Sequence, residues 1–298
     1  MNNTTYKSLK FAVLGGDRRQ LHMASGLSKS GCSVKLYGFD GYTERLDGLT
    51  LCKDLKTVID NCNYVVLPLP YSVDGVTLNA PSSKKITKMS EIYDLITNDM
   101  MVLGGKFSSH ELNSRGVKTV DYFEREELQI LNAIPTAEGA IQTAMEERPY
   151  TLSRSQCLVV GYGRIGKVLS SMLKGLNANV SVSARKFEDL AWIKAYGMKP
   201  VLTSEIEGII DRYDIVFNTV PAPVIDKKVL KNSKNSTLFI DLASKPGGID
   251  FEEARLCGID TVWSLSLPGK VAPATAGEFV KDTILNIIEQ EGVRYDSN

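Results

Sequence analysis

The chain has 298 residues, 43% of them hydrophobic and 23% charged, which is a globular composition long enough for two domains of ordinary size. Its 35 lysines and arginines balance 35 aspartates and glutamates, so the net charge gives no support for nucleic acid or an anionic membrane as a partner. No apolar run is long enough to cross a bilayer, and the first ten residues lack the apolar core of a signal peptide. Five cysteines without CxxC spacing and two histidines outside any metal-ligand pattern predict reduced thiols, no metal site and a cytoplasmic location.

Short apolar runs alternate with helical stretches from the first residues onward. In the first half the predicted strands are residues 10–14, 33–37, 64–67, 101–103 and 118–122. The series restarts near Ser155, and the predicted strands of the second half are residues 157–160, 180–183, 200–202, 215–218, 238–241 and 261–264. Alternation of this kind is typical of βαβ units and parallel sheets.

The fold class is therefore predicted to be α/β, with two doubly wound Rossmann-like domains that have parallel sheets and face each other across a cleft. We expect a substrate domain over residues 1–135 plus a C-terminal helix at 273–298, and a nucleotide-binding domain over residues 136–272. Pro135 is expected to break the helical stretch between the halves, and Thr136 to cap a fresh bridging helix. The segment 275–290 has an apolar face and is expected to cross back to the first domain.

A glycine motif follows the first strand of the second half and opens a helix. Its members are Gly161, Tyr162, Gly163, Arg164, Ile165 and Gly166. In a dinucleotide-binding turn the first glycine permits the tight turn, the second lets the backbone approach a pyrophosphate, and the third lets helix and strand pack closely. The alternative is a glycine turn in a Rossmann-like domain that binds nothing.

The end of the next strand discriminates between the two nicotinamide cofactors. The segment there is Ser183, Ala184, Arg185 and Lys186, without the carboxylate that would bind the ribose 2′-hydroxyl of NAD. A guanidinium and an ammonium group suit a 2′-phosphate, so the sequence favours NADP. The alternative is that Arg185 and Lys186 only form a solvated helix start.

Two further strand ends of the second half are expected to flank the nicotinamide, because open α/β sheets bind ligands at their carboxyl edge. The residues concerned are Asn218, Thr219, Val220 and Pro221 after one strand, and Asp241 and Ala243 after the next.

The first half has a glycine turn of its own, Gly15–Gly16, followed by Asp17, Arg18, Arg19 and Gln20. Arg18 fills the position of the third glycine, so we predict a carboxylate-binding corner rather than a second nucleotide site. The alternative is surface arginines at a helix start. Lys106 and Arg125, at other strand ends, are expected to add positive charge.

No residue is an obvious general base. His22 and His110 both lie in the first half, and the 263–270 loop, where hydroxyacid dehydrogenases carry their histidine, contains none.

Taken together, four segments resemble the family of dipicolinate synthase A subunits from endospore-forming bacteria. The segments are residues 15–20, 134–139, 241–248 and 267–273, and the resemblance extends over nearly the whole chain. It implies oxidation of a cyclic dihydro- or hydroxytetrahydro-dipicolinate to dipicolinate with NADP⁺ as hydride acceptor. It also implies a flavoprotein-like partner, the B subunit of dipicolinate synthase, further copies of the chain, and a place in the mother cell of a sporulating bacterium.

The resemblance also assigns residues to the two ligands. Leu267, Pro268 and Gly269 join the cofactor-binding candidates. Consecutive helical residues point about 100° apart, so only one of Arg18 and Arg19 is expected to face a substrate carboxylate. The resemblance includes an arginine followed by glutamine, which favours Arg19, with Gln20 beside it. Thr136 and Glu138 are expected to line the same site. Lys245 stands where the family suggests an arginine; a lysine keeps the positive charge but cannot bind a carboxylate with two parallel hydrogen bonds. Two alternatives stay open: a non-catalytic NADP-binding scaffold or sensor, and an enzyme of the hydroxyacid- or alanine-dehydrogenase kind.

Overall fold

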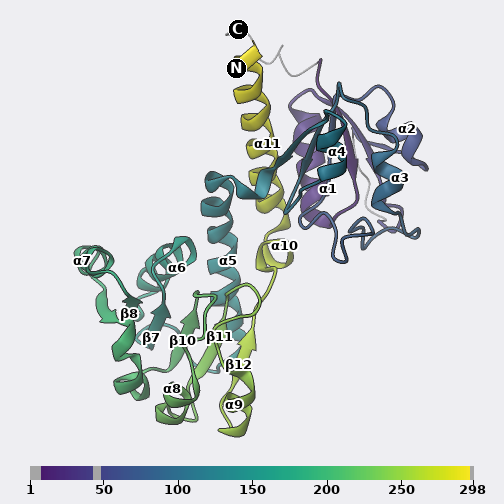
Figure 1. Cartoon of the computed structure of the whole chain (residues 1–298). Helices are drawn as coiled ribbons and strands as arrows, with labels where there is room; N and C mark the ends of the chain where they lie inside the picture. Colours follow the sequence, from purple (N-terminus) through teal and green to yellow (C-terminus); the bar gives the residue numbers. More distant parts are fainter. Residues whose placement is uncertain (1–7, 43–47, 296–298) are drawn as a thin grey trace. The chain divides into compact units, whose positions relative to one another are not determined.

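The computed structural model describes residues 8–42 and 48–295. Its internal contacts divide the chain into two compact units, which Figure 1 shows in sequence colours. Unit 1 comprises Met1–Leu131 and Ala272–Asn298, and unit 2 comprises Asn132–Val271. The sequence placed the corresponding boundaries after residues 135 and 272.

Unit 1 is built on a six-stranded parallel sheet with the strand order β3-β2-β1-β4-β5-β6. Its strands are β1 (Lys10–Leu14), β2 (Ser33–Tyr37), β3 (Thr50–Leu51), β4 (Tyr64–Val66), β5 (Met101–Gly104) and β6 (Lys118–Asp121). Its shorter helices are α1 (Arg18–Lys29), α2 (Leu55–Ile59), α3 (Met89–Tyr93) and α4 (His110–Ser114), with a 3₁₀ turn η2 (Tyr122–Glu124). The sequence missed β3, because both of its residues are exposed at the sheet edge and show no apolar pattern.

Unit 2 repeats the same architecture, with the strand order β12-β11-β10-β7-β8-β9. Its strands are β7 (Gln156–Val160), β8 (Asn179–Ala184), β9 (Lys199–Leu202), β10 (Ile215–Asn218), β11 (Leu238–Asp241) and β12 (Thr261–Trp263). Its helices are α6 (Arg164–Gly175), α7 (Phe187–Ala195), α8 (Lys227–Asn232), α9 (Phe251–Leu256) and α10 (Leu267–Val271), with 3₁₀ turns η3 (Thr203–Gly208) and η4 (Ile210–Arg212). The predicted fold class of two parallel Rossmann-like sheets with flanking helices is confirmed.

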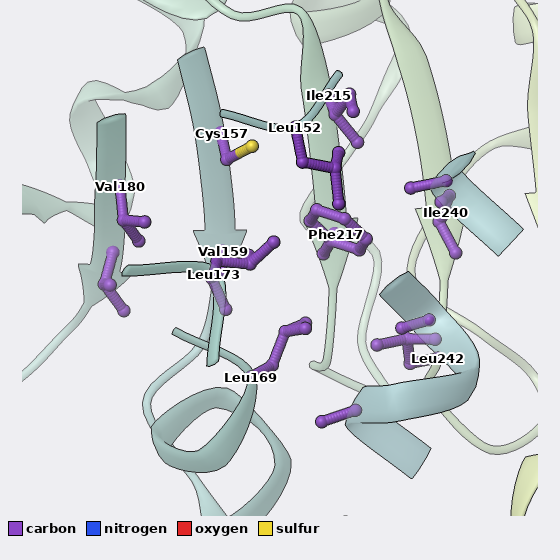
Figure 2. Close-up of a cluster of buried hydrophobic side chains, with 14 of the residues drawn as sticks. Leu152, Cys157, Val159, Leu169, Leu173, Val180, Ile215, Phe217, Ile240 and Leu242 are labelled. Atoms are coloured by element: carbon purple, nitrogen blue, oxygen red, sulfur yellow. The ribbon is translucent and has the colours of Figure 1, made fainter. Parts of the chain in front are cut away.

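Each sheet is covered on both faces, which explains why its central strands are continuous apolar runs. In unit 2, Val159 and Phe217 of neighbouring strands pack with Leu169 of α6 in one core cluster (Figure 2). Alternate residues of the same strands, such as Val160 and Val216, belong to a cluster on the opposite face. In both sheets the strand order reverses beside the first strand, β1 or β7, and ligands of open α/β sheets bind outside the strand ends at such a reversal.

The expected helix break at Pro135 is wrong, because α5 runs without interruption over Glu126–Glu147. Proline removes one backbone donor, which would have paired with the carbonyl of Leu131 four residues earlier. Thr136 does not cap a new helix; its hydroxyl donates to the carbonyl of Asn132 at 2.7 Å, inside the same helix. The loss of one hydrogen bond is tolerated because α5 buries Leu128 in a core cluster of unit 1 and Ala137 and Ala140 in a core cluster of unit 2.

The last helix, α11 (Pro273–Tyr295), packs closely against α1 within unit 1. Its Val280 and Ile284 lie in the same core cluster as Phe11 and Val13 of β1. Glycine makes this close approach possible, since a Cβ on Gly277 would lie 2.5 Å from the carbonyl oxygen of Arg19. Among the described residues, no helix combines the length and the hydropathy that a membrane span requires.

Candidate functional site

The glycine motif of unit 2 forms a tight turn between β7 and α6. Gly161 has a φ of +97°, and its N–H donates to the carbonyl of Ser183 at 3.1 Å. A Cβ there would lie 2.6 Å from Oγ1 of Thr219, and a Cβ on Gly166 would lie 2.1 Å from the carbonyl oxygen of Gly161. The first and third glycines are therefore required by the packing of the protein itself.

Gly163, the second glycine of the motif, behaves differently. It precedes the first turn of α6 with a φ of −80°, which any residue can adopt, and a Cβ there would meet no atom within 4 Å. As the N-cap of α6, Gly163 has no side chain to accept from the helix. The open space at its Cβ position adjoins the positive end of the helix dipole, an arrangement that fits a pyrophosphate.

The end of β8 supplies the groups that would meet the adenosine half of a dinucleotide. The hydroxyl of Ser183 is buried and, among the described residues, has no hydrogen-bond partner. Arg185 is exposed and forms no ion pair or hydrogen bond within the described part of the chain. Lys186 lies 3.3 Å from Glu188, but both side chains are at least 70% exposed, so this pair is weak. No carboxylate stands between residues 183 and 186, so the residues present fit a nucleotide with an anionic ribose substituent.

Asn218 and Asp241, at the ends of β10 and β11, form buried hydrogen bonds that hold the loops at this edge of the sheet. Both are fully buried, and Asn218 Nδ2 donates to Asp241 Oδ1 at 2.8 Å. Asp241 also accepts from the backbone N–H groups of Ala243 at 3.0 Å and Gly248 at 2.7 Å, which fixes the loop after β11. Solvent reaches this edge at Thr219, Val220 and Pro221 instead.

The remaining cofactor candidates divide between core and surface. Leu267 is buried and packs against Gly139 of α5, so it is a core residue. The packing is close, because a Cβ on Gly139 would lie 3.0 Å from the Leu267 side chain. Pro268 and Gly269 follow it in α10 and are half-buried. Lys245 is exposed in the loop after β11, with no ion pair or hydrogen bond to the described residues.

The Gly15–Gly16 turn of unit 1 is covered by the chain itself. The N–H of Gly16 donates to the carbonyl of Asn79 at 2.8 Å, and a Cβ on Gly15 would lie 3.0 Å from Ala80. These glycines therefore allow a loop to pack on the turn. A second nucleotide could not approach it.

Arg19 lies on the first turn of α1, as predicted, but the guanidinium is already engaged. Its Nε and Nη2 donate to the carboxylate of Asp17, with Nη2–Oδ2 at 2.8 Å, and Nη2 also donates to the carbonyl of Leu69 at 3.0 Å. Asp17 in turn caps the helix by accepting from the N–H of Arg19. Only Nη1 has no partner among the described residues, so Arg19 offers one nitrogen, and not a bidentate pair, to a substrate carboxylate. Arg18 is exposed.

Gln20 is a structural residue rather than a surface neighbour of Arg19. It is buried, and its Nε2 donates to the carbonyl of Leu67 at 3.1 Å. The hydroxyl of Tyr122 donates to the same carbonyl at 3.0 Å. Burial raises the pKa of Tyr122, so its phenol stays a donor at neutral pH. No sequence pattern predicts that Gln20 and Tyr122 share the carbonyl of Leu67, because the three residues lie about fifty positions apart in the chain.

Lys106 is the most available of the predicted cations in unit 1. Its backbone has a φ of +56°, held by Asp121, whose carboxylate accepts from the N–H groups of Lys106 at 3.0 Å and Phe107 at 3.1 Å. Its ammonium lies 5.7 Å from the centroid of the Phe123 ring. By contrast, Arg125 donates to Glu127 at 2.9 Å and to Gln290 at 2.7 Å.

Glu138, on α5, is exposed. Both histidines are exposed and lie in unit 1. No three histidine, cysteine or acidic side chains of the described residues come together as a metal site.

The fold and the glycine loop define a two-domain α/β protein whose second unit is a nucleotide-binding domain of the dehydrogenase type. Residues 10–123 match the family model of the N-terminal domain of the dipicolinate synthase A subunit. Residues 128–247 match that of the D-isomer specific 2-hydroxyacid dehydrogenase, NAD binding domain.

Relatives of known name are similar to this protein over almost the whole chain. The A subunit of dipicolinate synthase from Bacillus subtilis (strain 168) is 32% identical over 286 residues, covering 95% of this chain and 96% of the relative. The crystal structure of the same subunit from Bacillus halodurans gives a TM-score of 0.86 at 30% identity, over 94% of this chain and 97% of that chain. The crystal structure of dipicolinate synthase, A chain, from Bacillus subtilis gives 0.84 at 31%, over 96% and 98%. The chain belongs to the family of dipicolinate synthase A subunits.

Proposed function

We propose that this protein oxidises a cyclic dihydro- or hydroxytetrahydro-dipicolinate to dipicolinate, with NADP⁺ as the hydride acceptor. The observation that carries the proposal is the open space at the Cβ position of Gly163, beside the N-terminus of α6, which would accommodate a pyrophosphate. Membership of the family of dipicolinate synthase A subunits supports the reaction. The product class follows from the name of the Bacillus subtilis relative.

The preference for NADP rests on the end of β8. Gly161, Gly163 and the first turn of α6 would hold the pyrophosphate, and Arg185 and Lys186 the 2′-phosphate. Arg185 has no competing acidic partner among the described residues, and the exposed ion pair of Lys186 with Glu188 costs little to exchange for a phosphate. Thr219, Val220 and Pro221 are the accessible residues that would line the nicotinamide side, with Asn218, Asp241 and Ala243 fixing the loops.

The reaction makes modest demands on the protein. Bound NADP⁺ supplies the hydride acceptor; the dihydro substrate also loses one proton, giving dipicolinate, NADPH and H⁺, and the hydroxytetrahydro form additionally loses water. Because the ring becomes aromatic, the residues chiefly need to bind and orient the dicarboxylate, and solvent can take the proton. The reaction therefore does not require a histidine in unit 2, which has none.

We propose Lys106 as the main carboxylate-binding residue of unit 1, with Nη1 of Arg19 as a second donor. A lysine held in the left-handed region by Asp121 is the kind of strained residue that often marks a ligand site. Lys106→Ala should raise the KM for the dicarboxylate about tenfold, with the Kd for NADP⁺ unchanged. Lys29→Ala, an exposed lysine at the far end of α1, is the matched control. Equal KM values for the two variants would exclude Lys106.

The direct experiment mixes purified chain with NADP⁺ and freshly generated dihydrodipicolinate, and follows NADPH and pyridine absorbance. The proposal requires both signals to rise in equal amounts. Absence of turnover, with and without the B subunit of dipicolinate synthase, would overturn it.

A second function is a non-catalytic NADP-binding scaffold or sensor, with catalysis in the B subunit. It is favoured by one observation: both histidines lie in unit 1, outside the nucleotide-binding unit. A single-turnover measurement with the chain alone separates the two, since a scaffold would bind NADP⁺ without forming NADPH. We further propose that the chain works with the B subunit, and as several copies, in the mother-cell cytoplasm of a sporulating bacterium.

A further inference from the structure

Unit 2 has a groove of about 680 Å³, and most of its lining residues have no role in the proposed function. It lies between α6 and α7, which flank the sheet in Figure 1, and reaches the glycine loop at Tyr162. Its lining residues are Tyr162, Lys167, Val168, Ser171, Met172, Lys174, Trp192, Tyr196 and Met198. A volume of this size falls in the range of small-molecule sites, about 300–1,000 Å³.

Aromatic rings dominate the groove. Trp192 and Tyr196 stack with their ring centroids 5.6 Å apart and an interplanar angle of 20°, and each is 57% exposed. Tyr162 is nearly buried and contributes a third ring from the glycine loop. Stacked rings open to solvent are suited to a flat aromatic ligand.

The polar side chains that line the groove can all donate hydrogen bonds, and none carries a negative charge. Within the described residues, neither the hydroxyl of Tyr162 nor Nε1 of Trp192 has a hydrogen-bond partner. The ammonium of Lys167 lies 5.4 Å from the centroid of the Tyr162 ring. The lining contains no carboxylate; Glu188 and Asp189 stand on the first turn of α7, outside it. Burial, Tyr196 and Asp189 raise the pKa of Tyr162, so its phenol remains a donor at neutral pH.

We propose that this groove binds a planar aromatic carboxylate. The stacked rings of Trp192 and Tyr196 would contact the flat face of the ligand. Tyr162 and Lys167 would donate to its carboxylate. Charge complementarity favours an anion, because the lining offers two ammonium groups, one of which, on Lys174, is fixed by the carbonyl of Tyr196 at 2.5 Å. The assignment stands apart from the proposed reaction, although dipicolinate belongs to the same chemical class.

The test uses the full chain with Trp263→Phe, which leaves Trp192 as the single tryptophan. Benzoate and pyridine-2,6-dicarboxylate should quench its fluorescence to saturation, whereas non-planar cyclohexanecarboxylate and uncharged benzamide should bind at least about tenfold more weakly. Lys167→Gln and Tyr196→Leu should each weaken benzoate about tenfold. Lys194→Gln, an α7 lysine outside the lining, should leave it unchanged.

Three results would overturn the proposal. One is quenching that does not saturate. A second is binding that survives Lys167→Gln and Tyr196→Leu but is lost in Lys106→Ala, which would place the probe at the candidate substrate site. The third is absence of probe binding together with self-association that Tyr196→Leu abolishes, which would make the rings a protein interface. Titration of NADP⁺ on Tyr196→Leu, whose substituted residue lies outside the glycine loop and the first turn of α6, reports separately on the proposed function.

Discussion

At the residue scale, the three glycines of the cofactor loop are not equivalent. The motif assigned the first and third glycines to the turn and its packing and the second to the approach of a pyrophosphate. In the structure the first and third are crowded, whereas the second is open. A Cβ at residue 166 would overlap the carbonyl oxygen of Gly161, whereas a Cβ at residue 163 would enter open space. Substitution at the two positions should therefore give opposite phenotypes.

Gly163→Ala should keep the thermal stability of the parent and weaken NADP⁺ binding at least about tenfold, because the methyl group fills the approach to α6. Gly166→Ala should lower the free energy of unfolding by about 2 kcal/mol or more, through displacement of the loop backbone. Urea unfolding and nucleotide titration on both variants check the pair. Parent-like NADP⁺ affinity in a folded Gly163→Ala variant would contradict the assignment.

Two buried thiols give a pH dependence. Burial raises the pKa of Cys32 to about 11 and that of Cys157 to about 12, from an ordinary 9.0. Above pH 9 the unfolded chain releases these protons while the folded chain keeps them. The free energy of unfolding should therefore fall by up to about 1.4 kcal/mol per pH unit for each thiol, between pH 9 and its folded pKa. Urea unfolding between pH 8 and 10.5 measures the slope.

The control for this slope is Cys157→Val, which removes one thiol from β7 and keeps an apolar side chain. Its stability should fall less steeply with pH than that of the parent, because tyrosines and lysines that titrate in the same range are common to both proteins. Identical slopes would show that Cys157 is not the group that is titrating.

At the scale of elements, the sequence predicted most strands correctly because parallel strands covered on both faces are continuous apolar runs. It failed where long-range contacts decide. Pro135 suggested a break, but α5 is held by the cores on both sides of it. Gln20 was expected beside a substrate, but its amide donates to the carbonyl of Leu67, a contact between distant segments. Binding of a substrate carboxylate by Arg19 stays a prediction, with Asp17 paired to two nitrogens of its guanidinium.

The packing of α1 against α11 depends on glycine. A Cβ at Gly277 would lie 2.5 Å from the carbonyl oxygen of Arg19 and 2.9 Å from the backbone nitrogen of Met23. Gly277→Ala should lower the free energy of unfolding by about 1–3 kcal/mol, because the backbones would have to separate. Gly175→Ala, at a helical glycine with open space around it, should have no cost or a gain of up to about 1 kcal/mol. Denaturant unfolding of both variants measures these changes. Equal free energies of unfolding for Gly277→Ala and Gly175→Ala would contradict the close packing of α1 and α11 at Gly277.

At the scale of the whole molecule, two units with the same strand order differ in how their glycine turns are packed. Unit 2 keeps its glycine turn open at Gly163, whereas unit 1 covers its turn with residues 78–80. The same topology therefore leaves a turn open to a nucleotide in unit 2 and closes the corresponding turn in unit 1. The sequence distinguished the two turns by the third position of the motif, which is glycine in unit 2 and Arg18 in unit 1. The covering of the unit 1 turn could not be predicted, because the covering loop lies more than sixty residues beyond it.

The central claim is that the site of unit 2 selects NADP through Arg185. Calorimetric titration of NADP⁺ and NAD⁺ into the parent and Arg185→Ala tests it most directly. We predict that the parent binds NADP⁺ at least about tenfold more tightly, a difference of about 1.4 kcal/mol, and that Arg185→Ala removes this difference while leaving NAD⁺ nearly unchanged. Equal affinities of the parent for the two nucleotides, or tighter binding of NAD⁺, would contradict the account.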